Sequence, residues 1–275
     1  MTALLKIEWL KIKKYPAFWW MLGIVTLTYP GINLMFFNMY DNITKGKEMA
    51  NNVAKMLLGN PFAFPETFHT VAYFSSFFVL LPAILVIMLI TNEYQYRTHR
   101  QNIIDGWSRY QFIGSKLIDV AIISSIVTLV FISVAIGFGI YADELSWNRW
   151  AEQLQYIPLF FLQTFAQLSI AFLLGYLVKK AFIALGIFLF YYLIIENILV
   201  GFLKLKQIPI GRFLPFEMSD GILVAPAFVG KFGDKAKEGY ELALTMVYQQ
   251  VIGTIILTAL IWFICFKVHQ KRDLS

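Results

Sequence analysis

Charged residues are scarce in this 275-residue chain: Asp, Glu, Lys and Arg together make up 15% of it. In a soluble globular domain they make up about a quarter. Hydrophobic residues account for 59% of the chain, and its mean hydropathy is +0.65. So few charges cannot solvate the surface of a fold this apolar. The composition therefore excludes an ordinary soluble domain and indicates a membrane protein.

Cysteine and histidine are also rare. The single cysteine, Cys265, cannot form an intrachain disulfide or a thiolate metal site, and the three histidines lack the spacing of metal ligands. No Gly-x-x-x-x-Gly-Lys-Ser/Thr phosphate loop occurs, so the chain has no recognisable means of hydrolysing ATP. We therefore expect a protein that is not an enzyme and that binds no metal or cofactor itself.

The net charge of +6 does not predict a nucleic-acid partner, because the basic residues are not clustered on a solvated segment. Lysine and arginine accumulate at the cytoplasmic ends of membrane helices, and this rule explains the same excess. We expect membrane lipid around the chain, and no nucleic acid.

Apolar runs of about 20 residues, the length that crosses a bilayer core, recur along the chain. We predict an all-α integral membrane protein that forms a single transmembrane domain and passes several times through the bacterial inner membrane. The six predicted spans are residues 17–37, 71–91, 117–141, 157–178, 181–203 and 244–266. Lys and Arg outnumber acidic residues before the first span, in alternate connections and after the last span. The positive-inside rule therefore places both termini in the cytoplasm.

Two segments outside the spans have patterns of their own. Residues 1–16 are basic and imperfectly amphipathic, which predicts a helix lying at the cytoplasmic interface, with a flank that only fixes topology as the alternative. Residues 204–241 are interrupted by Pro and Gly but are too apolar for an ordinary external loop. Non-helical backbone at membrane depth must be surrounded by protein or water. We therefore predict re-entrant or interfacial helices between spans five and six.

The cytoplasmic segment 92–116 is polar and patterned. Glu93 and Arg97 are four residues apart in the order that favours a helical ion pair, and Arg100 continues that surface, so a helix is predicted here. Asp105-Gly106 then predicts a break. Ser108-x-x-Gln111 is a capping box, which predicts that a new helix begins there.

In this segment the chain resembles permeases of the ABC-2 exporter family, whose second and third spans are joined by an acidic residue, a basic-Thr pair, and Ser-Arg followed by Lys. Glu93, Arg97-Thr98, Ser108-Arg109 and Lys116 match that pattern. Where many members have Gly-Thr and a Pro before Ser-Arg, this chain has Arg97-Thr98 and Gly106-Trp107. The six spans, basic first segment and long fifth connection also fit the family at low resolution.

The resemblance implies that residues 92–116 contain a coupling helix that docks into a separate nucleotide-binding ATPase subunit, which would hold ATP and Mg. It also implies a second permease copy or paralogue. By resemblance, the residues at or near the joint with the ATPase are Glu93, Arg97, Arg100, Asp105 and Arg109.

The expected function is therefore the membrane-spanning subunit of an ATP-driven exporter that moves an amphipathic solute, such as a peptide, a drug or a lipid-like molecule, outward. For the segment 92–116, the alternative is a solvated loop whose charges only set topology. For the whole chain, the first alternative is a non-transporting scaffold or sensor subunit that binds a cytosolic partner, and the second is an ion-coupled transporter.

Uncharged polar side chains also lie within the predicted spans. Gln163 and Gln167 are one helical turn apart, and Gln250 and Thr254 form a second stripe. Such groups face protein or water rather than lipid. They either hydrogen-bond neighbouring helices together or contact a solute in the pathway.

Two carboxylates are predicted near the ends of spans. Glu196, in the fifth span, could turn that helix back toward the external surface, pair with Lys204, or line an exit for the solute. Asp119, near the cytoplasmic start of the third span, is expected to be interfacial and paired with Lys116 or a neighbour.

Overall fold

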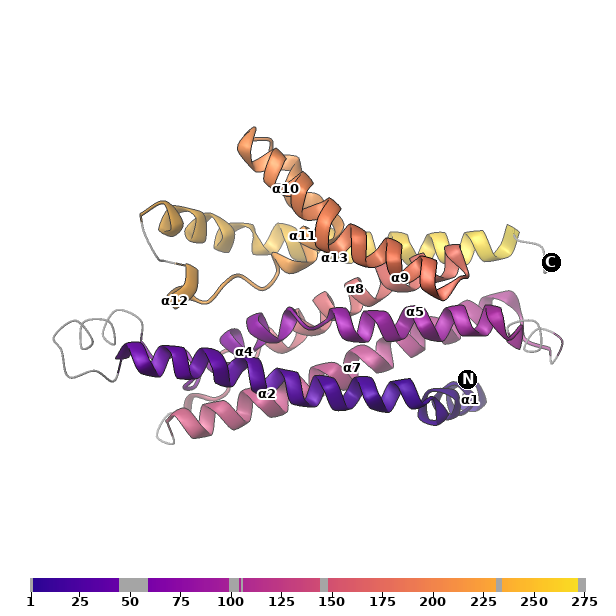
Figure 1. Ribbon diagram of the computed structural model, residues 1–275, viewed down its shortest axis with the longest axis horizontal. Coiled ribbons are helices and arrows are strands. Elements are labelled where there is room, and N and C mark those ends of the chain that lie inside the picture. The colour runs from indigo at the N-terminus through magenta and orange to yellow at the C-terminus, as the bar shows by residue number, and fades with distance from the viewer. Residues whose placement is uncertain are drawn as a thin grey trace.

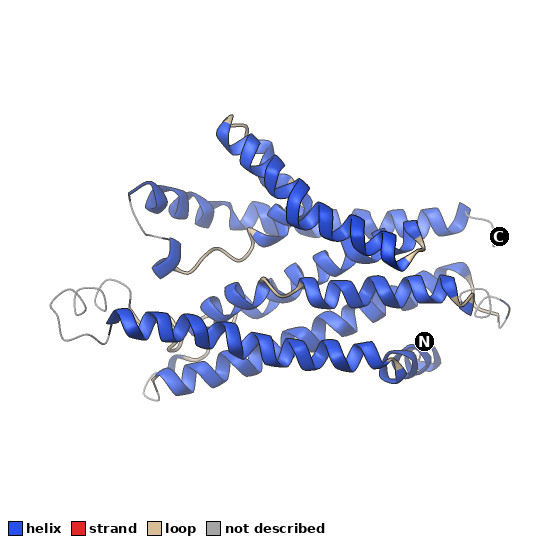
Figure 2. Cartoon of the chain, viewed as in Figure 1, coloured by secondary structure: helices blue, strands red, loops and turns tan. Residues whose placement is uncertain are grey.

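The computed structural model describes residues 2–44, 59–98, 104, 106–143, 148–230 and 234–271, and every regular element in those ranges is helical. Figures 1 and 2 show an elongated bundle in which most of the long helices run along one direction and the helix containing α9 and α10 crosses them obliquely. The predicted all-α class is confirmed. Five helices are long and apolar enough to cross a membrane. They are α2 (Pro16–Thr44), α7 (Arg109–Ala142), α8 (Tyr156–Val178), the helix Ala181–Leu205, and the part Gly239–Gln270 of α13 (Asp234–Lys271).

The second predicted span is not one straight helix. It corresponds to α4 (Thr67–Ser76) and α5 (Leu80–Gln95), which are bent by 50° at the break between them. Pro82 has no N–H to donate to the carbonyl of Phe78, so a continuous helix would lose a hydrogen bond at this point. Leu81 N–H donates to that carbonyl instead, at 3.1 Å. If the bent pair crosses the membrane as one unit, the number of spans is six.

The remaining elements are short, apart from the segmented helix after α8. That helix consists of α9 (Ala181–Phe190), a π-helical turn (Tyr191–Ile195) and α10 (Glu196–Leu205). Residues 204–241 contain a 3₁₀ helix (Pro209–Phe213), α11 (Pro215–Asp220), α12 (Ala227–Gly230) and the first residues of α13. At the N-terminus, α1 (Thr2–Lys14) precedes α2 and accounts for most of the predicted segment 1–16.

Helix α8 is the centre of the bundle. It packs against α4, α5, α7 and α13, and it is more deeply buried than the other long helices. Its small residues Ala166, Ala171 and Gly175 allow the neighbouring backbones to come close, as is usual where membrane helices pack. Its buried polar residues face these neighbours and not the outside of the bundle.

The two ends of the bundle differ in what they carry. Figure 1 shows both ends of the chain at the end of the bundle where α5 finishes and α7 begins, and we call this the terminal end. A guanidinium N–H of Arg109, at the start of α7, donates to the carbonyl of Gln270 in α13, which joins these elements there. The C-terminal end of α2, the start of α4, and α12 lie at the opposite end, which we call the distal end.

Leucine in place of Gly175 should destabilise the bundle. A Cβ added at Gly175 would lie 2.6 Å from Cγ2 of Ile90 and 3.4 Å from Cα of Ile87, so α8 would have to move away from α5. Overpacking of this kind costs about 1–3 kcal/mol. At Gly137 an added Cβ meets nothing within 4 Å, which makes Gly137→Leu the matched control. We expect the melting temperature in detergent to fall for Gly175→Leu alone; equal values would contradict the close packing of α5 on α8.

Candidate functional site

The N-terminus of α7 is built as the capping box predicts. The backbone N–H of Gln111 donates to Oγ of Ser108 at 3.2 Å, and the backbone N–H of Ser108 donates to Oε1 of Gln111 at 2.8 Å. Gly106, with φ of +95°, occupies the left-handed region in the predicted break just before the cap. This start fixes the register of α7 and brings Lys116 two turns into the bundle.

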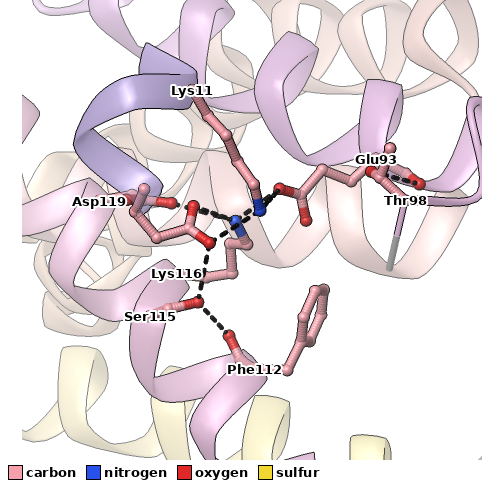
Figure 3. Close-up of polar contacts among 8 residues, drawn as sticks. Lys11, Glu93, Thr98, Phe112, Ser115, Lys116 and Asp119 are labelled. Carbon is pink, nitrogen blue, oxygen red and sulfur yellow. Dashed lines mark hydrogen bonds and ion pairs between the residues drawn. The ribbon is translucent and has the colours of Figure 1, made fainter. Parts of the chain in front are cut away.

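Five charged side chains from three helices form what we call the charge cluster. Its members are Glu8 and Lys11 of α1, Glu93 of α5, and Lys116 and Asp119 of α7. Nζ of Lys116 lies 2.6 Å from Oε2 of Glu8, 2.7 Å from Oε1 of Glu93 and 3.2 Å from Oδ2 of Asp119. Lys11 approaches two of the same carboxylates, Glu8 at 2.9 Å and Glu93 at 3.3 Å. Figure 3 shows the two ammonium groups converging between α1, α5 and α7. The predicted pairing of Asp119 with Lys116 is confirmed.

The centre of the charge cluster is buried, so its charged groups depend on one another. Lys116 is 5% exposed and Glu8 is 1% exposed. Burial by itself raises the pKa of Glu8, but the Lys116 ammonium, hydrogen bonds and Lys11 lower it to about 2. Three carboxylates share two ammonium groups, and a cavity of about 220 Å³ lies beside them. Removing one partner of a buried pair leaves an uncompensated charge, so the cluster holds the three helices together.

The prediction of a continuous helix through Glu93 and Arg97 is wrong, because α5 ends at Gln95. Arg97 has φ of +57°, outside the helical range, and its side chain is exposed. The two residues therefore do not share one helical face. The physical reason is that Glu93 bonds inward to Lys11 and Lys116, and these long-range contacts outweigh a local i,i+4 pair, which stabilises a helix by only about 0.5 kcal/mol.

The other residues assigned by resemblance to the ATPase joint lie in or beside the α5–α7 connection. Arg109 begins α7 and bonds to the end of α13. Arg100 and Asp105 lie outside the described residues. The sequence did not suggest that Glu8 and Lys11 belong to the charge cluster, because they are 85 and 82 residues away from Glu93 and no local pattern connects them.

The intramembrane glutamines meet at the short helix α11. The side-chain amides of Gln163 and Gln167 both donate to Oδ1 of Asp220, each at 2.7 Å. Gln167 also lies 3.1 Å from Oγ of Ser219. These hydrogen bonds link α8 to α11. Asp220 does not belong to a helical repeat of polar residues, so the sequence pattern did not identify it as a partner of the glutamines.

Glu196 also holds α11. Its Oε1 accepts hydrogen bonds from the backbone N–H groups of Phe216, at 2.7 Å, and Glu217, at 2.6 Å, which are unpaired donors of the first turn of α11. The proposed pair with Lys204 is not formed, since Lys204 binds Glu217 at 2.7 Å. Two backbone donors to Oε1 hold the side chain of Glu196, which is 3% exposed, against the start of α11.

The second polar stripe reaches α11 from α13. The hydroxyl of Thr254 lies 3.5 Å from the carbonyl oxygen of Met218. The side chain of Gln250 fills the space above Gly221, where a Cβ would come within 2.1 Å of it. Gln163, Gln167, Glu196, Gln250 and Thr254 therefore converge on α11 and the residue after it, from α8, α10 and α13.

Among the described residues, no group of three or more His, Cys, Asp or Glu side chains is arranged to hold a metal ion.

Neither the curated proteins nor the solved structures gave a match to this chain. Residues 49–275 match the family model DUF2705, described as a protein of unknown function, and the chain therefore belongs to that family.

Proposed function

We propose that this chain is the membrane-spanning subunit of an ATP-driven exporter of the ABC-2 type, located in the bacterial inner membrane. The observation that carries the proposal is the charge cluster, which ties α1, the end of α5 and the start of α7 together at the end of the bundle where the α5–α7 connection emerges. A connection that receives force from a partner needs such a rigid attachment to the membrane helices.

The charge distribution supports a cytoplasmic terminal end. The basic residues gathered there are Lys6, Lys11, Lys13, Lys14, Arg97, Arg109, Lys116, Lys179, Lys180 and Lys267. At the distal end, Glu66, Asp143 and Glu152 accompany Arg149, and the end of α10 and the connection after it are nearly balanced, with Lys204, Lys206 and Arg212 against Glu217 and Asp220. By the positive-inside rule both termini would lie in the cytoplasm, and with α4 and α5 as one bent span the chain would cross the membrane six times.

The ATPase would bind the exposed residues around the α5–α7 connection, which we call the docking surface. Tyr96 is 70% exposed, Ile104 80% and Tyr110 60%, and the exposed Arg97 adds a positive charge. Exposed aromatic and aliphatic side chains next to an arginine are typical of protein interfaces. We propose a nucleotide-binding subunit as the occupant, because the chain has no phosphate loop of its own.

Helix α8 offers a route from the docking surface to the distal half of the molecule. It packs against α5 and α7, which the charge cluster joins, and it holds Asp220 of α11 through Gln163 and Gln167. A tilt imposed on α5 and α7 would therefore be passed to α11 by rigid elements and hydrogen bonds. Two discrete positions of α11 would then open and close the outward side of the pathway.

We further propose that α11 re-enters the membrane from outside. Gln163 lies seven residues after the start of α8, which is about 10 Å along the helix axis. Backbone at that depth must be satisfied by protein, and Glu196 meets two of the first-turn N–H groups of α11. The exposed apolar side chains of α9 and α10, including Phe182, which is 90% exposed, would face lipid or a second permease copy.

Charge reversal on the docking surface tests the proposal. Arg97→Glu should release the ATPase during affinity purification from native membranes, whereas Lys180→Glu should retain it. Both residues are exposed basic residues at the terminal end, but Lys180 lies in the α8–α9 connection. Glu93 is unsuitable for this test, since its reversal would break the charge cluster. Equal retention of the ATPase by the two variants would contradict the assignment of the docking surface.

A further inference from the structure

A cavity of about 600 Å³ lies beside α11, between the end of α4, the 3₁₀ helix, the connection before α12, and α13; we call it the α11 cavity. Its volume is in the range of small-molecule sites. Tyr73, Phe77, Leu223 and Met246 provide apolar and aromatic walls, and charged groups enter it from α10, the 3₁₀ helix and α11.

Asp220 lies at the wall of the α11 cavity, with its carboxylate fixed by hydrogen bonds. Gln163 and Gln167 both donate to Oδ1 and fix the orientation of the side chain. Among the side chains that the structure describes, none donates a hydrogen bond to Oδ2 and no cation lies within 4 Å of the carboxylate. Two neutral amides orient a carboxylate but do not neutralise its charge, so a cationic group of a ligand would find a pre-organised acceptor here.

Arg212 brings the opposite charge to the same cavity. Its guanidinium lies against the sulfur of Met246, and no carboxylate among the side chains that the structure describes lies within 4 Å of it. The other two charges of the cavity, Lys204 and Glu217, pair with each other at 2.7 Å. Because Lys204 and Glu217 neutralise each other, Asp220 and Arg212 are the two charged groups of the lining that a ligand could bind.

We propose that the α11 cavity binds an amphiphile with a zwitterionic head group, whose primary ammonium bonds to Asp220 and whose anionic group bonds to Arg212. Tyr73 and Phe77 supply aromatic faces that also favour an ammonium group, and Leu223 and Met246 contact the apolar part. A ligand lacking either charge leaves one charge of the cavity unpaired and binds more weakly. The assignment of this amphiphile as the exported solute rests on the proposed function; its binding does not.

The test uses purified full-length chain and lysophosphatidylethanolamine as the probe. Lysophosphatidylglycerol, which has the same phosphate but no ammonium, and dodecylamine, which has an ammonium but no phosphate, are the matched probes. Binding is measured by native mass spectrometry. We expect one lysophosphatidylethanolamine per chain, with an affinity at least about tenfold higher than that of either matched probe, because each matched probe lacks one charge-assisted hydrogen bond.

Variants assign the two charges. Asp220→Asn keeps an oxygen acceptor for the two glutamines, and it should lose about tenfold in affinity for lysophosphatidylethanolamine and the preference over lysophosphatidylglycerol. Arg212→Gln should lose the preference over dodecylamine. Glu152→Gln removes an exposed charge that pairs with Arg149, and it should bind as the wild type does. Equal binding of all three probes, or wild-type selectivity in Asp220→Asn, would overturn the proposal.

Solvent extraction of the purified protein identifies the natural source of the head group. A stoichiometric phosphatidylethanolamine in the extract would support a membrane lipid as the occupant. An extract without it, from protein that selects the probe, would support another amphiphile with the same head-group chemistry. This binding assay contains no ATPase, so its failure would leave the docking experiment unaffected, and failure of docking would leave the binding result unaffected.

Discussion

Lys116→Met should lower the free energy of unfolding by about 3–5 kcal/mol, because it leaves Glu8, Glu93 and Asp119 in one buried site with Lys11 as their remaining cation. Methionine has a similar length but no charge. A loss of this size lowers the melting temperature in detergent by on the order of 10 °C. The measurement is a thermal melt of the purified chain.

Two variants separate the lost pairing from other effects of the change. Lys14→Met removes the same charge from an exposed position on α1 and should change the melting temperature little. Adding Glu8→Gln to Lys116→Met should restore part of the lost stability, because fewer carboxylates then repel one another. If Lys116→Met has the same melting temperature as the wild type, the charge cluster does not hold α1, α5 and α7 together.

The paired change Gln163→Leu and Gln167→Leu should cost roughly 3 kcal/mol or more, because both donors to Oδ1 of Asp220 disappear and the carboxylate is left buried without them. Each hydrogen bond to a charged group contributes about 1.5–3 kcal/mol. We expect a lower melting temperature and, in an assembled exporter, loss of ATP-dependent transport, since α11 would no longer follow α8.

The matched control is Gln249→Leu on α13, at an exposed position, which should leave the melting temperature near that of the wild type. Adding Asp220→Leu to the paired glutamine change should recover stability, because removing donors and acceptor together leaves no unpaired charge. Transport should stay lost in this triple variant. A triple variant no more stable than the double one would show that the hydrogen bonds to Asp220 do not hold α11.

The elements that the sequence could predict are those with local causes. Apolar length located five of the long membrane helices, although α2 and α7 extend beyond the predicted ends of their spans. The capping box at Ser108 located the start of α7 correctly, because both of its hydrogen bonds are formed within four residues. The glutamine stripe identified the face of α8 that bonds to protein.

The errors and omissions have long-range causes. The bend in the second span follows from Pro82. Hydropathy located this apolar run, but it does not report that a proline interrupts the helix. Glu93 bonds to Lys11 and Lys116 instead of forming the predicted local helix with Arg97, and only the tertiary fold brings Lys11 there. Asp220 lies in a short helix without periodicity, so its contact with α8 could not be predicted from the sequence.

A separate nucleotide-binding subunit is proposed to drive the movement of this chain. The most direct test is to purify the wild-type chain from its native membrane and determine the stoichiometry of any bound ATPase. We expect one ATPase subunit per permease chain, in a complex with two of each. A chain that purifies without a nucleotide-binding protein, or with a cytosolic partner of another class, would contradict the claim and support a membrane scaffold or sensor instead.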